Sequence, residues 1–333
     1  MAEEERVHDH DWSTTRAWVT STLGPGERIG AVERLRGGWT SEMRRLRIDR
    51  PGGEPGHLVL RSFVQPFFLE HAEALLGREA EMLTLLGPTE VPAAALHAVD
   101  PTGSHCDHPS LLMTLLPGQV RLDDHEAVPR AELMARQLLA IHRTDVTTRP
   151  RAYQPWTGPE RVRVPRETGR PELWERAVQL IDREPPPYRG TFLHRDFHPG
   201  NVLFSGTGED LRISGVVDWV ETSWGPADLD VAHCSTALAL LHGPAEGLRF
   251  AARYTAAGGT LDPNRDARLY WRLLDALAYA PDAEKVAVPW RELGRTDLTP
   301  ALLTDRLEHY LEGLLLRSGH QPSGARGTAT PTS

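Results

Sequence analysis

The sequence predicts an α+β protein with two lobes, a small antiparallel sheet followed by a larger, mainly helical part. Two patterns indicate this order. Short apolar runs bounded by turn residues, typical of strands, occupy the first third of the 333 residues. After Gly118, apolar residues recur three and four positions apart, as in amphipathic helices. We therefore expect a first lobe over residues 1–116, a second over 117–317, and a disordered tail over 318–333.

The first lobe should begin with a helix over residues 11–23, which ends at a Gly-Pro-Gly turn. A second helix is expected over 68–86, where Leu and Met recur at helical spacing and Gly87 follows. The expected strands cover 31–35, 43–48, 58–61, 93–99 and 110–116, the first three as an antiparallel meander. One sheet of about five strands should result.

The second lobe should consist of helices interrupted by a single hairpin. The expected helices cover 130–141, 171–181, 229–241, 245–256, 267–280 and 300–316. An apolar content of 40% supplies a sizeable core for such a lobe.

Composition excludes several classes of protein. The net charge of −9 argues against a nucleic-acid partner and favours a cationic one, although acidity also serves solubility alone. Cys106 and Cys234 lie too far apart to indicate a zinc site or a disulfide framework. No run of eighteen apolar residues and no leader segment is visible, so we expect a cytoplasmic protein with no membrane partner. Lys285 is the only lysine, which excludes a Walker A phosphate-binding loop.

One polar segment carries most of the chemical information. Residues 194–201 read His-Arg-Asp-Phe-His-Pro-Gly-Asn between two apolar, strand-like runs. Catalytic groups are typically found on loops that rigid elements position, so Asp196 and Asn201 are candidate functional residues. A second apolar run, 213–217, ends at Asp218. If the two runs form a hairpin in which Asn201 lies opposite Asp218, their oxygens suit Mg²⁺.

The spacing of these residues resembles that of known phosphotransferases. His194-Arg195-Asp196 followed by Asn201 fits the catalytic loop of protein kinases, with Asp218 in the place of the second kinase aspartate. Residues 30–315 are more similar still to the aminoglycoside phosphotransferase family. The matching segments are 113–118, 138–142, 194–203, 216–219 and 225–232.

The resemblance implies a kinase-like fold and phosphoryl transfer from ATP or GTP to a small molecule. It implies that Asp196 orients or deprotonates the acceptor hydroxyl, while Asn201 and Asp218 hold Mg²⁺. Asp230 is expected to anchor the site. His142 and His198 are expected to brace the loop through hydrogen bonds and not to bind metal.

In the first lobe, the resemblance places Gly37 and Gly38 over the phosphates, although paired glycines are also ordinary turn residues. The family's usual strand lysine is replaced by Arg61. Glu79 lies on the apolar stripe of its helix, where a carboxylate requires a cation, so we expect an Arg61–Glu79 pair; a local pair with Arg78 is the alternative. The resemblance also assigns nucleotide contacts to two residues of the segment that ends the sheet, Met113 and Leu115.

The acceptor site is less clearly defined by the sequence. Asp228, Trp271 and Asp275 could form acidic and aromatic walls for an amine-bearing acceptor, or they could be core residues. An aminoglycoside or similar antibiotic is the expected acceptor. The alternatives are a metabolite such as homoserine, choline or a sugar, or a non-catalytic nucleotide-binding module. A protein kinase fits poorly because no Ala-Pro-Glu motif follows Asp218.

Overall fold

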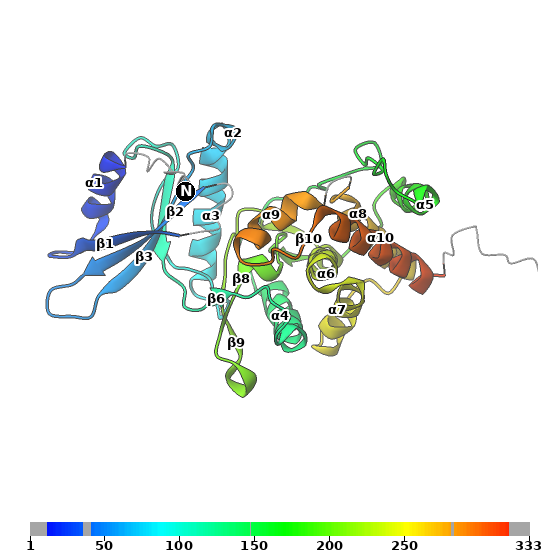
Figure 1. Ribbon diagram of the computed structural model, residues 1–333. Coiled ribbons are helices and arrows are strands. Elements are labelled where there is room, and N and C mark those ends of the chain that lie inside the picture. Colours follow the sequence, from blue (N-terminus) through cyan, green and yellow to red (C-terminus); the bar gives the residue numbers. More distant parts are fainter. Residues whose placement is uncertain (1–11, 36–40, 147, 281–282, 320–333) are drawn as a thin grey trace, which may run out of the picture. The chain divides into compact units, whose positions relative to one another are not determined.

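The computed structural model describes residues 12–319 apart from 36–40, 147 and 281–282. The chain divides into two compact units, residues 1–116 and residues 117–333. Figure 1 labels the elements of both units. Within the described residues, no helix combines the length and the apolar character that crossing a bilayer requires.

Unit 1 is built on an antiparallel five-stranded sheet in the order β1-β2-β3-β5-β4. The first three strands form the expected meander. The strands are β1 (Arg28–Leu35), β2 (Glu42–Asp49), β3 (Gly56–Ser62), β4 (Leu96–Asp100) and β5 (Ser110–Thr114). The helices of this unit are α1 (Ser13–Thr22), α2 (Pro66–Leu69) and α3 (Ala72–Leu86).

Alternation along the strands separates the two faces of this sheet. Leu46, Leu58 and Leu60 form one apolar cluster with Val19 of α1, so α1 covers their face (Figure 1). Val59 and Arg61 of β3 alternate with these leucines and point to the opposite face, where Arg61 contacts Glu79 of α3. The sheet of unit 1 therefore has a helix on each face, and the buried Arg61 lies on the α3 side.

Unit 2 is mainly helical and also contains two small sheets. Its helices are α4 (Ala127–His142), α5 (Pro171–Ile181), α6 (Ala227–His242), α7 (Pro244–Ala256), α8 (Arg265–Leu277), α9 (Glu284–Glu292) and α10 (Pro300–Arg317). One sheet has the order β6-β8-β9 and the other pairs β10 with β7. Their strands are β6 (Gln119–Val120), β7 (Gly190–Leu193), β8 (Val202–Ser205), β9 (Arg212–Val216) and β10 (Ser223–Pro226).

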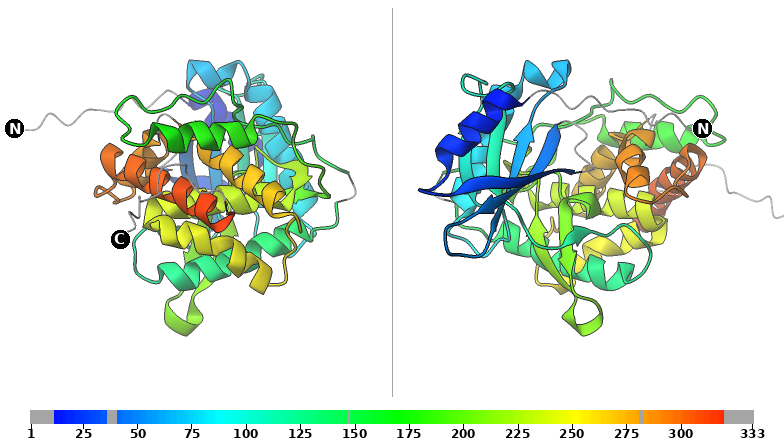
Figure 2. Two further views of the ribbon diagram at one scale, coloured as in Figure 1. Left: turned by 90° about the vertical axis from the view of Figure 1, so that its right-hand side faces the viewer. Right: turned by 60° about the vertical axis from the view of Figure 1, so that its left-hand side comes forward.

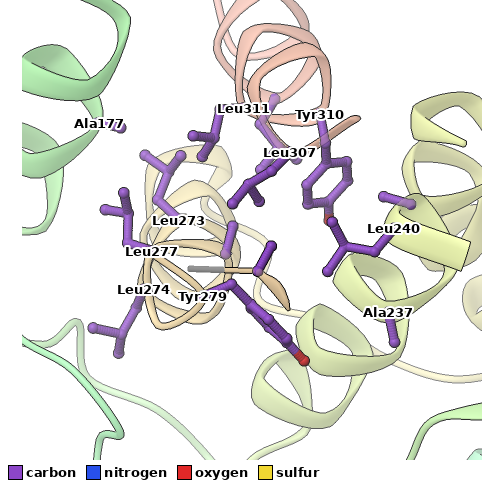
Figure 3. Packing of buried hydrophobic residues seen from close by; sticks show 14 of the residues in the cluster. Ala177, Ala237, Leu240, Leu273, Leu274, Leu277, Tyr279, Leu307, Tyr310 and Leu311 are labelled. Carbon is purple, nitrogen blue, oxygen red and sulfur yellow. The ribbon is translucent and has the colours of Figure 1, made fainter. Parts of the chain in front are cut away.

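Helix α6 forms the centre of unit 2, because every residue from Asp228 to Leu241 is buried. A helix that is apolar on all sides requires neighbours on all sides, and α4, α7, α8 and α10 supply them. Figure 2 shows α10, in orange-red, beside the yellow helices α6 and α7. In Figure 3, Leu307 and Tyr310 of α10 lie between Leu273 of α8 and Leu240 of α6.

Local sequence signals fix the ends of several of these helices. The Asn264 side chain caps α8 by accepting the N–H of Asp266 at 2.8 Å, and the Thr299 hydroxyl caps α10 ahead of Pro300. Helix α9 was not expected from the sequence, because its nine residues include Pro289. The expected fold class is confirmed: a small antiparallel sheet precedes a larger helical part.

Candidate active site

The segment 194–201, called here the Asp196 loop, connects β7 to β8 in unit 2. Its last three residues, Pro199–Asn201, form a short 3-10 turn. The buried Asp230 carboxylate on α6 accepts the backbone N–H groups of His194 and Arg195, both at 2.9 Å. A carboxylate that accepts two main-chain donors fixes the local backbone conformation. Helix α6 therefore holds the start of the loop in place.

Asp230 is itself held by a second buried group. His142, at the end of α4, contacts Asp230 through Nε2 at 3.2 Å and the Tyr254 hydroxyl through Nδ1 at 2.7 Å. Burial opposes ionisation of Asp230, but the hydrogen bond and charge of His142 outweigh burial and lower the pKa of the carboxyl. His142 therefore braces the Asp196 loop through Asp230, in agreement with the expectation from the sequence.

His194 connects the loop to Val217, the residue that follows strand β9. Its Nδ1 accepts the N–H of Asp196 at 3.2 Å, so the proton of the neutral ring lies on Nε2, which donates to the Val217 carbonyl at 3.0 Å. Burial lowers the pKa of His194. The ring is therefore neutral at pH 7, and its two nitrogens bind two main-chain groups.

Asp196 lies at the centre of the loop with partners on both carboxylate oxygens. Its Oδ2 accepts the Asn201 amide at 2.9 Å, and its Oδ1 lies 3.1 Å from Nε2 of His233 and 3.8 Å from Nε2 of His198. Burial opposes ionisation, but the imidazoles of His198 and His233 hold the pKa of Asp196 well below its usual value. The side chain keeps 29% of its exposure, so an ionised, oriented carboxylate is accessible from solvent.

The hairpin formed by β8 and β9 brings Asn201 and Asp218 to the same end, but not in the expected register. Val202 pairs with Val216, and the Val217 N–H donates to the Asn201 carbonyl at 3.0 Å, so Asn201 lies opposite Val217. The expected register is wrong by one residue. The observed register starts at the hairpin tip, where Ser205 pairs with Arg212, and a bulge at Ser214 then shifts it by one residue.

Asp218 has nevertheless remained near the Asp196 loop. Its charge acts on both His194 and His198, where it partly offsets the effect of burial on their pKa values. Asp218 has a φ of 64°, and Arg195 has a φ of 76°. Non-glycine residues rarely adopt this region, and such strain concentrates at functional sites. Arg195 lies within the Asp196 loop, and Asp218 acts on the two histidines of that loop, His194 and His198.

The donor atoms at this end of the hairpin fit Mg²⁺. The amide nitrogen of Asn201 donates to the backbone oxygen and to Oδ2 of Asp196, both at 2.9 Å. These bonds fix the orientation of the amide. They direct Oδ1 of Asn201 away from Asp196, so that this oxygen can serve as a metal ligand. With the carboxylate of Asp218, the set contains the hard oxygen ligands that Mg²⁺ prefers.

Unit 1 contributes a separate buried charge pair. Nη1 of Arg61 donates to both carboxylate oxygens of Glu79, at 3.0 and 2.9 Å, and Nε donates to Ser41 at 3.1 Å. The Arg61 guanidinium also lies over the ring of Phe63. The expected Arg61–Glu79 contact is therefore confirmed. A role for the pair in nucleotide binding stays a prediction.

The remaining nucleotide residues expected in unit 1 have different positions. Gly37 and Gly38 lie outside the described residues. Met113 is buried in β5, on the same face as Arg61, and Leu115 follows that strand. The Leu115 N–H donates to the His57 carbonyl at 3.3 Å, so in this conformation it is used within unit 1.

The structure places the three expected acceptor residues inside unit 2. Trp271 is fully buried and packs at right angles against Tyr153, so it is a core residue and not a wall of the acceptor site. Asp228 is buried and accepts the Asp262 N–H at 3.0 Å; burial raises its pKa to about 6. Asp275 is buried too, and it binds other protein groups. None of the three is an exposed acceptor contact here.

His233, which contacts Asp196 directly, was not predicted as a site residue from the sequence. His233 is 3% exposed, and its imidazole lies between Asp196 and Asp275. The helical spacing of the sequence around Asp230 could have indicated His233. His233 follows Asp230 by three positions, and residues at this spacing share one helix face. Placing Asp230 at the loop therefore places His233 there as well.

A small sheet with a helix on each face, a mainly helical unit, and a loop that joins an aspartate to an asparagine define a kinase-like phosphotransferase. The family model described as the phosphotransferase enzyme family matches residues 31–307. The chain therefore belongs to the phosphotransferase enzyme family, and it is an enzyme. The family predicted from the sequence is thus confirmed. No protein in the curated set matches the sequence.

Solved structures share the fold at low sequence identity. A Ralstonia eutropha protein, provisionally assigned as an aminoglycoside phosphotransferase, superposes with a TM-score of 0.61 and 17% identity, covering 93% of this chain and 99% of its own. Aminoglycoside phosphotransferase APH(4)-Ia superposes with a TM-score of 0.57 and 15% identity, covering 92% of this chain and 98% of its own. Macrolide 2′-phosphotransferase MphH from Brachybacterium faecium superposes with a TM-score of 0.51 and 17% identity, covering 85% of this chain and 94% of its own. At such identities the likeness concerns the fold.

Proposed function

We propose that the protein is a small-molecule kinase that transfers the γ-phosphate of ATP or GTP, with Mg²⁺, to a hydroxyl group of an aminoglycoside or similar antibiotic. One observation carries the proposal. Asp196 is ionised and accessible, and its carboxylate is tied to Asn201 at 2.9 Å on a loop whose backbone Asp230 holds. This is the arrangement that phosphoryl transfer requires of a protein, since positioning and charge account for most of the rate.

Asp196 accepts the hydrogen bond of the acceptor hydroxyl and orients its oxygen toward the γ-phosphorus. The acceptor oxygen then forms a bond to phosphorus, the bond to the nucleoside diphosphate breaks, and the hydroxyl proton passes to the Asp196 carboxylate. Asn201 and Asp218 would hold Mg²⁺, which neutralises charge on the phosphates. Because the pKa of Asp196 is low, proton transfer accompanies bond formation and does not precede it.

The nucleotide is assigned to residues of unit 1. Arg61, fixed by Glu79 at 2.9 Å, takes the role of the lysine that the chain lacks, and Gly37 and Gly38 cover the phosphates. Met113 and Leu115 are assigned apolar contacts with the base. Structural neighbours support a nucleotide co-substrate, because APH(4)-Ia structures contain ADP or AMP-PNP.

A polycationic acceptor is supported by charge and by the structural neighbours. The chain carries a net charge of −9, which attracts amine-bearing compounds. The same APH(4)-Ia complexes hold hygromycin B. The cytoplasm is the compartment we propose, since nucleotide and antibiotic meet there. We propose no role for nucleic acid.

A coupled assay of nucleotide consumption tests this function. Purified protein, Mg²⁺ and ATP or GTP are combined with a panel of aminoglycosides, macrolides, homoserine, choline and sugars, and phosphorylated product is identified by mass spectrometry. Turnover of an antibiotic supports the proposal. Turnover of a metabolite alone would replace the acceptor, and nucleotide binding without any transfer would indicate a binding module.

The Asp196→Asn variant provides the first specific prediction. We expect kcat to fall by roughly 10²- to 10⁴-fold, because the acceptor oxygen loses its anionic partner. Nucleotide affinity, measured by calorimetry, should change less than about threefold. Asp210→Asn, which alters an exposed aspartate of the β8–β9 connection, is the matched control and should retain full activity. An unchanged kcat in Asp196→Asn contradicts the proposed role.

A further inference from the structure

His233 lies between two carboxylates that come from different parts of unit 2. Its Nε2 is 3.1 Å from Oδ1 of Asp196, and its Nδ1 is 3.1 Å from Oδ1 of Asp275 on α8. The other oxygen of Asp275 accepts the Thr236 hydroxyl at 2.6 Å. His233 and Asp275 are each only 3% exposed. The contact therefore connects a buried carboxylate to the partly exposed carboxylate of Asp196.

The geometry specifies the protonation state of this imidazole. A neutral ring has one N–H, so one of its nitrogens would direct a lone pair at a carboxylate oxygen 3.1 Å away. The doubly protonated ring donates to both. Burial alone would lower the pKa of His233, but the carboxylates of Asp275 and Asp196 outweigh burial and raise it to about 9.

A metal ion is the alternative occupant of this group, because ligand atoms of Asp196, His198 and His233 lie within 4.8 Å of one another. The tautomer of His198 argues against it. Nδ1 of His198 accepts the Gly200 N–H at 3.0 Å, so the ring proton lies on Nε2, the nitrogen that faces Asp196. A metal bound there would require a ring without either proton. The group therefore forms a hydrogen-bonded network.

We propose that His233 and Asp275 are a positioning pair for the phosphoryl-transfer reaction, in which the His233 imidazolium donates one hydrogen bond to Asp275 and one to Oδ1 of Asp196. The proposal rests on the function proposed above. Asn201 holds Oδ2 of the same carboxylate. Asp196 is thus fixed at both oxygens, and the plane of its carboxylate is set before the acceptor binds.

The pair also determines whether Asp196 acts as a strong base or mainly orients the acceptor hydroxyl. A cation at 3.1 Å keeps the carboxylate ionised and weakens it as a base. Asp196 therefore orients the hydroxyl and receives its proton only when the new bond to phosphorus has made that hydroxyl acidic. This suits a loose transition state, in which the nucleophile needs orientation more than early deprotonation.

The pH dependence of this pair is set by groups from several elements. Tyr279, just after α8, stacks against His233, and its hydroxyl lies 3.4 Å from Nδ1 of that imidazole. Figure 3 shows the Tyr279 hydroxyl directed toward α6. The titratable groups that contact His233 are Asp196, His198, Asp275 and Tyr279. The charge of Arg195 acts on Tyr279, and its guanidinium lies over Trp156, whose ring packs against His233. The two carboxylates are the hydrogen-bonding anions among them, so they dominate its protonation.

Two variants and one control test the pair. His233→Gln keeps an amide donor near Asp196 but removes the titratable cation. Asp275→Asn keeps an oxygen acceptor for Nδ1 but removes the anion. Asp266→Asn alters an exposed aspartate of the same helix, α8. For each protein, kcat and KM are measured across pH with the acceptor found above, and histidine ¹⁵N NMR follows the imidazoles of the free protein.

In the wild type, we expect the His233 signal, assigned by its loss in His233→Gln, to titrate near pH 9, with an alkaline limb of kcat at the same pH. In Asp275→Asn both should move down by about one to two pH units. In His233→Gln that limb should disappear, and kcat should fall roughly 10- to 100-fold at pH 7 with little change in nucleotide KM. The Asp266→Asn control should match the wild type.

The results separate this inference from the proposed function. An inactive wild type contradicts the proposed function, whereas the NMR titration still reports the charge of His233. An active wild type whose His233 signal titrates below about pH 7 overturns the inference. So does an Asp275→Asn profile that coincides with the wild-type profile. Poor folding of one variant does not remove the test. The wild-type titration does not need Asp275→Asn, and the comparison of the wild-type and Asp275→Asn pH profiles does not need His233→Gln.

Discussion

Two of the charged groups described above differ in how far they are exposed to solvent. In unit 1, Arg61 and Glu79 are an ion pair whose side chains are 7% and 2% exposed. In unit 2, Asp196, His233 and Asp275 combine two carboxylates with one imidazole, and Asp196 remains 29% exposed. The first pair balances its charge internally. The second carries one net negative charge and presents it to solvent, as a site that acts on a ligand must.

The comparison implies that loss of a partner has different effects in the two places. A buried ion pair costs stability when one member is removed, because the other charge stays buried without compensation. In the Asp196 group, the accessible carboxylate can be hydrated, so the same kind of change should affect rate and pH dependence more than folding.

Glu79→Gln should lower the free energy of unfolding by about 3 kcal/mol, since the Arg61 guanidinium remains buried beside a neutral amide. It should also raise the nucleotide KM roughly tenfold, while kcat changes less, because Arg61 loses its fixed position. Urea denaturation and steady-state kinetics measure the two effects. Glu81→Gln, an exposed glutamate on the same helix, is the control. A stable variant with unaltered KM would show that the pair supports neither folding nor nucleotide binding.

The sequence allowed the Arg61–Glu79 contact to be predicted because an acid on an apolar helical stripe is a local signal. Most helices were predicted for the same reason, from spacing alone. The β8–β9 register was missed because the sequence pattern does not show where pairing starts at the hairpin tip. Ser205 pairs with Arg212, and the bulge at Ser214 then shifts the register by only one residue. His233 was missed because a histidine within an all-buried helix resembles core, and its partner Asp275 lies 42 positions away.

The stability of the protein should fall as pH rises from about 6.5 to about 9. The folded-state pKa of His233, about 9, lies above its ordinary value of 6.5, so its contribution is complete below pH 6.5 and is lost on passing through pH 9. The loss should be on the order of 2–3 kcal/mol. His194, His198 and His242 have lowered pKa values and titrate below this window. Urea denaturation at several pH values measures the change.

The His233→Gln variant is the control for this pH dependence, because glutamine does not titrate. Its free energy of unfolding should be nearly constant over the same range. Equal pH dependence in both proteins would show that another group is responsible, and would remove His233 from the comparison.

The smallest expected effect concerns Asp228, a buried acid with no cationic hydrogen-bond partner among the contacts described. Burial raises its pKa to about 6, so its contribution is complete below pH 3.8, declines as pH rises to about 6, and is a constant cost above that. Asp228→Asn should therefore stabilise the protein at pH 7.5 by about 1–2 kcal/mol, with little gain at pH 4, because the amide oxygen can still accept the Asp262 N–H.

Asp228→Asn also tests the acceptor role that the sequence suggested for this residue. If Asp228 is a structural acid, kcat and acceptor KM should stay within about twofold of the wild type. Asp262→Asn removes the neighbouring like charge, which contributes to the raised pKa, and should give a smaller gain in stability. A tenfold rise in acceptor KM for Asp228→Asn, with no gain in stability at pH 7.5, would return Asp228 to the acceptor site. It would also show that Asp196 is not the only accessible acid of unit 2, because an acid that binds an acceptor amine must be accessible to that amine.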